Sequence, residues 1–110
     1  MAGAKQITFT YENKTYTLEY DRRTVKLMER RGFNLDELGA KPLTLLPQLF
    51  WGAFQKHHRN VPQDTTDKML DGFKDREALY GRLTEMYTEP ILTLMDDEES
   101  EGNVEWEPNW

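Results

Sequence analysis

The chain has 110 residues, a hydrophobic fraction of 37% and a formal net charge of −6. This length fits one domain with its own core, and the lack of cysteines excludes disulfides, cysteine-ligated zinc and a thiol nucleophile. No apolar run approaches the roughly 20 residues of a membrane-spanning helix, and no signal-peptide stretch precedes the first predicted strand. We therefore expect a cytosolic protein.

Residues 5–20 predict a β-hairpin, because apolar residues alternate with polar ones on both sides of a turn. Asn13 and Lys14 form the predicted two-residue turn, since Asn tolerates the left-handed conformation that the turn needs. The register that follows pairs Tyr11 with Tyr16, Phe9 with Leu18 and Ile7 with Tyr20. All six apolar side chains then share one face. No other stretch predicts a strand, so this face must pack on helices.

Residues 22–31 predict a short helix with Asp21 as its N-cap. Gly32 suits the left-handed position that commonly ends a helix. Phe33 is then placed to pack on Met28, as a Schellman motif requires.

Residues 43–58 predict the central helix, buried on most sides, because two apolar stripes recur at helical spacing. The first stripe comprises Leu43, Leu46, Phe50, Ala53, Phe54 and His57, and the second comprises Leu45 and Leu49. Pro47 fits this helix only if the helix begins near Thr44, which places the proline in the first turn.

Two further helices complete the predicted bundle. Asp64 is the expected N-cap of a short helix that ends near Gly72, and Asp75 is the expected N-cap of a longer one. The longer helix presents apolar residues at helical spacing: Leu79, Leu83, Met86, Tyr87, Pro90, Ile91 and Leu94. Pro90 removes a backbone donor, so we expect it to kink or split this helix. The periodicity stops after residue 95.

These elements predict an α+β fold, with an N-terminal two-stranded β-hairpin packed on a bundle of about four helices. Residues 1–95 form the single expected domain, which carries 14 basic and 13 acidic residues. Residues 96–110 hold seven acidic residues and no Lys or Arg, so we expect a disordered, flexible acidic tail. Such a tail repels phosphate backbones and argues against nucleic-acid binding.

The sequence carries no pattern typical of catalysis or of a cofactor site. It lacks a glycine motif for phosphate, and its one serine, Ser100, lies in the acidic tail. His57 and His58 are adjacent and cannot easily ligate one metal ion, so we interpret them as residues favoured by the C-terminal end of the central helix. We expect no enzymatic activity, no catalytic residue, no cofactor and no metal.

Basic side chains on the helix over residues 22–31 form one candidate partner-binding group. Arg22, Lys26 and Arg30 lie at the spacing of a single stripe, which could hold an acidic partner, a phosphate or the chain's own acidic tail. A solvated helix face is the simpler interpretation of the same pattern. Arg23, Lys26 and Arg30 are the basic residues predicted to bind a partner.

Large aromatic residues form the second candidate group, because they make strong anchors at interfaces. Trp51 and Tyr80 fall off the main apolar stripes, and Trp106 and Trp110 lie in the acidic tail. We predict that these four side chains contact a partner. For the two tail tryptophans, a tail that merely keeps the protein soluble is an equally weighted interpretation.

Three segments resemble the small tail assembly chaperones of long-tailed bacteriophages and of prophages of Gram-positive bacteria. They read KQITFTYENKTYTLEYDRRTVKLMERRGF, KPLTLLPQLFWGAFQKHH and LYGRLTEMYTEPILTLMDDEESEGNVEWEPNW. The resemblance implies a non-enzymatic protein of the host cytoplasm that coats the tape measure protein before tail tube subunits polymerise around it. It also implies self-association, the tail tube protein as a second partner and absence from the mature virion.

Two alternatives stay open beside this expectation. One is a structural tail protein, such as a completion or connector subunit, which would stay in the virion. The other is a small regulatory or nucleic-acid-binding protein that uses the basic stripe. Salt-sensitive DNA binding that is abolished by Arg23→Glu and Arg30→Glu would favour the latter.

Overall fold

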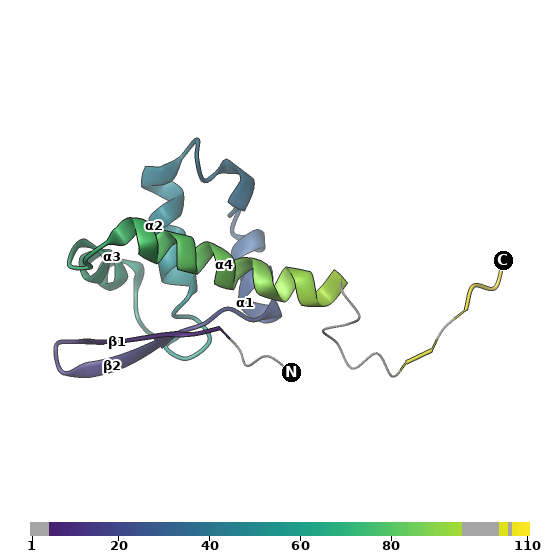
Figure 1. The fold of residues 1–110 in the computed structure, drawn as a ribbon, viewed down its shortest axis with the longest axis horizontal. Helices are drawn as coiled ribbons and strands as arrows, with labels where there is room; N and C mark the ends of the chain where they lie inside the picture. The colour runs from purple at the N-terminus through teal and green to yellow at the C-terminus, as the bar shows by residue number, and fades with distance from the viewer. Residues whose placement is uncertain (1–4, 96–103, 106) are drawn as a thin grey trace.

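The computed structural model of the chain describes residues 5–95, 104–105 and 107–110. Its elements are β1 (Ile7–Tyr11), β2 (Lys14–Leu18), α1 (Arg22–Arg30), the 3-10 helix η1 (Leu35–Glu37), α2 (Pro42–Gly52), α3 (Gln63–Asp71) and α4 (Arg76–Met95). In this part of the chain one two-stranded antiparallel sheet accompanies four α-helices, so the predicted α+β class is confirmed. Figure 1 shows the hairpin along one side of the helices, with α4 running across the molecule.

The strands agree with the prediction, whereas the register between them does not. The turn consists of Glu12 and Asn13, whose φ angles of 50° and 66° are both left-handed, as a type I′ turn requires. Phe9 therefore pairs with Tyr16 rather than with Leu18, and the two rings stack with centroids 5.4 Å apart. The predicted register was wrong because a shift of two residues leaves every side chain on its face, so alternation alone cannot separate the two pairings.

Helix α1 follows the predicted local signals at both ends. The Asp21 carboxylate accepts a hydrogen bond from the Thr24 amide at 2.8 Å, which confirms the N-cap. At the other end Gly32 adopts a φ of 90°. The amide of Phe33 donates to the carbonyl of Met28 at 3.0 Å, which confirms the Schellman motif.

Helix α2 is displaced toward the N-terminus relative to the prediction. It begins at Pro42, a favourable first position for proline, so Pro47 lies inside the helix rather than in its first turn. Leu43, which was assigned to an apolar stripe, is 93% exposed. Because Pro47 has no N–H, the carbonyl of Leu43 receives no helical hydrogen bond from position 47. Its exposed position near the start of the helix lets water bind this carbonyl instead.

The end of α2 was also predicted wrongly, since the helix stops at Gly52 rather than at His58. The amides that follow donate to carbonyls three residues back, beginning with Ala53 to Phe50 at 3.1 Å. The carbonyl of Ala53 accepts instead from the amide of Glu19 at 3.0 Å. The turn over residues 53–57 thus brings the chain back to the end of the hairpin, a tertiary contact that the helical pattern could not indicate.

Helices α3 and α4 differ from the prediction in one detail each. Pro62, and not Asp64, holds the N-cap position of α3, without a side-chain hydrogen bond, and Asp64 lies in the first helical turn. Asp75 directly precedes α4 as predicted, in a left-handed conformation. Helix α4 continues through Pro90 to Met95, so the proline does not split it.

The core forms where the apolar face of the hairpin packs on α2, as expected. Phe9 lies against Phe50 and Phe54, with ring centroids 6.5 and 6.1 Å away. The largest fully buried side chains are Phe50, Phe54, Leu18, Met28, Leu49 and Met69. The apolar stripe of α4 is not buried along its whole length, because Ile91 and Leu94 are 37% and 64% exposed. No other element of the described chain covers this end of the helix completely.

The C-terminal segment is described only in part. Residues 104–105 and 107–110 contain no helix or strand, and their side chains are exposed. The predicted disorder of residues 96–103 and the predicted role of Trp106 lie outside the described residues. Among the helices that the structure describes, none is long and apolar enough to cross a membrane.

Candidate partner-binding surfaces

A basic groove lies between α1 and the turn that follows α2, as an open depression of about 530 Å³. Its charged lining residues are Asp21, Arg23, Lys26, Arg30, Lys56 and Arg59. Five cations therefore line the groove beside one carboxylate, a charge that suits an anionic group.

Most of these cations have no counter-charge within the described residues. Lys56 pairs with the buried Glu19, with Nζ 2.7 Å from Oε2. Asp21 is occupied as the cap of α1. Across residues 5–95, 104–105 and 107–110, no ion pair involves Arg23, Lys26, Arg30 or Arg59. These four side chains give the groove its net positive charge.

The Glu19 carboxylate holds Lys56, which lines the basic groove. It is only 3% exposed and accepts hydrogen bonds from Gln6 and His57, both at 2.8 Å, as well as from Lys56. Burial by itself raises the pKa of Glu19, but the hydrogen bonds from Lys56, His57 and Gln6 outweigh burial and lower the pKa to about 2. A carboxylate held in this way is a structural anion rather than a general base at neutral pH.

The two histidines are also structural, although not in the predicted manner. They lie beyond the end of α2, so the interpretation as helix-end residues is wrong. His58 accepts a hydrogen bond at Nε2 from the Thr17 amide at 3.0 Å, and its ring lies edge-on to Tyr16. His57 contacts Glu19. In the described chain, no three His, Asp or Glu residues are placed to hold a metal ion.

An apolar groove of about 360 Å³ lies between α1 and the C-terminal half of α4. Its apolar lining comes from Val25, Pro90, Ile91 and Leu94, and Arg22, Lys26 and Glu29 stand at its rim. Leu92 on the same helix is 58% exposed. Lys26 lines both grooves, so the apolar groove and the basic groove adjoin at this side chain.

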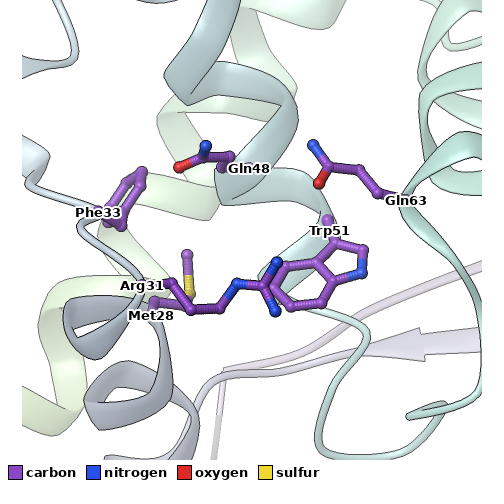
Figure 2. A pocket seen from close by; sticks show the side chains of 6 residues that line it. All are labelled: Met28, Arg31, Phe33, Gln48, Trp51 and Gln63. Atoms are coloured by element: carbon purple, nitrogen blue, oxygen red, sulfur yellow. The ribbon is translucent and has the colours of Figure 1, made fainter.

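A third and smaller pocket contains Trp51, as Figure 2 shows. The guanidinium of Arg31 lies over the indole, 4.4 Å from the ring centroid. Gln48 and Gln63 line the same space, whose volume is about 70 Å³. Cofactor sites usually occupy roughly 300–1,000 Å³, so this pocket has room for water or a small ion only.

The structure brings some of the predicted binding residues together and separates others. Arg23, Lys26 and Arg30 meet in the basic groove, whereas Arg22, which was predicted on their stripe, lines the apolar groove. Trp51 and Tyr80 are half-buried and line neither groove. Trp110 is fully exposed.

Several groove residues were missed from the sequence. Lys56 and Arg59 are distant from α1 along the chain, and only the turn after α2 places them beside it. Ile91 and Leu94 were placed on the apolar stripe of the last helix, and nothing in that spacing identified them as exposed. Both residues lie in the last turns of α4, just before the acidic segment. This position was the one sequence feature that could have indicated that their face lies outside the core.

A family model described as a domain of unknown function, DUF5055, matches residues 1–110. Neither the curated proteins nor the solved structures gave a match. The matched range includes the hairpin, all four described helices and the acidic C-terminal residues. The function is therefore inferred from the two grooves together with the resemblance of the sequence.

Proposed function

We propose that this chain, which belongs to the DUF5055 family, is a bacteriophage tail assembly chaperone that binds the tape measure protein. It keeps that protein soluble in the host cytoplasm while tail tube subunits polymerise, and it is absent from the finished virion. The resemblance of residues 5–33, 41–58 and 79–110 to such chaperones supports this function. The structural observation that carries it is the apolar groove between α1 and α4.

A tape measure protein is a long helical chain, and the exposed apolar side of such a chain aggregates unless it is covered. An apolar groove between two helices accepts the apolar face of a third helix. Ile91 and Leu94 offer apolar surface at this groove that the described chain leaves exposed. Arg22, Lys26 and Glu29 at the rim provide both signs of charge, which can fix the orientation of a bound helix.

The size of the exposed surface suits a chaperone that must later dissociate. Complete burial of one leucine side chain contributes about 1.5–3 kcal/mol. The free energy gained by burying a few partly exposed side chains is reduced by the cost of association, so we expect weak binding at each site. Many copies along one tape measure protein would then cover it, and each copy could be displaced by a tail tube subunit.

The test is co-expression of the chain with the tape measure protein of the same phage, followed by measurement of the soluble complex. Ile91→Gln combined with Leu94→Gln should weaken the complex at least about tenfold, because both side chains line the apolar groove and are exposed there. Leu43→Gln is the matched control, since Leu43 is 93% exposed on α2. We expect it to leave the complex unchanged.

Two results would contradict this function. Equal binding by the groove variant and by the Leu43→Gln control would exclude the apolar groove as the binding surface. Stoichiometric amounts of the protein in purified tails would instead favour a structural tail protein, such as a completion or connector subunit.

A further inference from the structure

We infer that the acidic run that follows α4, residues 96–101, docks in the basic groove of the same molecule. The inference concerns contacts within the chain and does not depend on the tape measure protein. It rests on charge complementarity, on the place where α4 ends and on the length of the segment.

Charge complementarity favours this occupant over a neutral one. Arg23, Lys26, Arg30 and Arg59 are not ion-paired among the described residues. The segment carries five carboxylates and no cation, while the rest of the chain is almost neutral. The excess positive charge of the groove is therefore opposite in sign to the one strongly acidic stretch of the sequence.

The C-terminal half of α4 lines the apolar groove, which adjoins the basic groove. Leu94 lines the apolar groove together with Lys26, and Lys26 also lines the basic groove. The acidic run begins at Asp96, directly after the last residue of α4. The acidic run therefore begins two residues after Leu94, which shares the apolar groove with Lys26.

The length of the segment is sufficient for docking within one molecule. Six extended residues reach at most about 20 Å, which exceeds the roughly 10–12 Å diameter of a helix with its side chains. A tethered segment of this kind has an effective concentration in the millimolar range, so several weak ion pairs suffice to hold it. Salt should release it, since exposed ion pairs are screened beyond about 10 Å at 0.1 M ionic strength.

The chain allows a selective label for the test, because it contains no cysteine. Ser100→Cys introduces a single thiol in the segment, to which a nitroxide spin label is attached. Amide signals of the ¹⁵N-labelled full chain are then recorded with the label oxidised and reduced. We expect broadening of the amides of residues 22–30 and 55–59 at low salt, and its loss at high salt.

Two charge-reversal variants separate specific docking from general attraction. Arg23→Glu combined with Arg30→Glu should abolish the broadening. Lys68→Glu combined with Lys74→Glu makes the same change of charge at exposed positions outside the groove, and it should preserve the broadening. Equal effects of both variants, or the absence of broadening on α1, would overturn the inference.

A mixed sample decides whether docking occurs within one molecule. Spin-labelled chain without ¹⁵N is added to ¹⁵N-labelled chain without the spin label. Broadening that occurs when one chain carries both labels, and not in the mixed sample, supports docking in the same molecule. Comparable broadening in the mixed sample would show that the segment binds a second copy, and would overturn the inference as stated.

Discussion

The ammonium group of Lys56 lies 2.7 Å from the carboxylate of Glu19, which is buried beneath it at the end of the hairpin. This ion pair connects the turn after α2 to the residue that follows β2. It also holds one cation of the basic groove in place, since Lys56 lines that groove. The stability of the fold and the shape of the groove therefore depend on the same contact.

Replacement of Glu19 by Gln should lower the free energy of unfolding by about 1–3 kcal/mol at neutral pH. The variant removes the anion that accepts from Lys56, His57 and Gln6. Urea denaturation measures the difference. No loss of stability would show that the carboxylate contributes nothing beyond its shape.

The effect of Glu19 should also depend on pH in one direction. Its pKa is about 2 in the folded protein against an ordinary value of 4.5, so its contribution is fully present above 4.5. The contribution is lost as the pH falls toward 2, because the unfolded chain then binds the proton more readily. The gap in unfolding free energy between the native chain and Glu19→Gln should thus shrink between pH 4.5 and pH 2.

His58 should make the hairpin sensitive to mild acid. Burial, and after it the charges of His57 and Lys14, lower the pKa of His58 below its ordinary value of 6.5. The unfolded chain therefore takes up this proton first, and stability falls as the pH drops below 6.5. Protonation also removes the acceptor of the Thr17 amide.

Hydrogen exchange of the Thr17 amide measures this loss of protection. Relative to the intrinsic exchange rate at each pH, protection at Thr17 should decrease below pH 6.5. In His58→Phe, which keeps an aromatic ring against Tyr16, protection should be low at every pH. Equal protection in the two proteins would contradict the role of Nε2 as acceptor.

Gly52 is required by the close approach of Met28. A Cβ atom at position 52 would lie 2.6 Å from Cε of Met28 and closer still to its Sδ. Met28 is only 2% exposed and cannot swing into solvent. Gly52→Ala should therefore cost about 1–3 kcal/mol of stability.

A double-mutant cycle tests the cause. In a Met28→Ala background the space is vacant, so the added methyl group of Gly52→Ala should cost little. An unchanged cost in that background would show that the backbone, rather than the methionine side chain, requires glycine.

Two exposed glycines should respond to alanine in opposite directions. Gly32 has a φ of 90° at the end of α1, and alanine there should cost about 1–2 kcal/mol. Gly81 lies inside α4, and an added Cβ would meet nothing within 4 Å. Alanine at this position should stabilise the protein by about 0.5–1 kcal/mol. Thermal unfolding of the two variants compares them directly, and a shift of the same sign in both would refute the conformational explanation.

The sequence by itself determined the features that depend on neighbouring residues. Asp21 and Gly32 correctly marked the two ends of α1. Their signals are local, because a cap and a Schellman motif involve atoms at most five residues apart. The apolar face of the hairpin followed from alternation, which survives a shift of two residues. The register itself did not follow, because only a pairing such as that of Phe9 with Tyr16 can select it.

Only the tertiary structure decided where α2 ends and which surfaces stay open. The Ala53 carbonyl accepts from Glu19, which lies 34 residues earlier in the chain, and this contact competes with continuation of the helix. The same turn places Lys56 and Arg59 beside α1. Helical spacing shows that Ile91 and Leu94 share a face, but coverage of that face depends on distant elements. Helical spacing cannot show whether a face is buried, because burial depends on how the whole chain packs and not on the spacing of apolar residues.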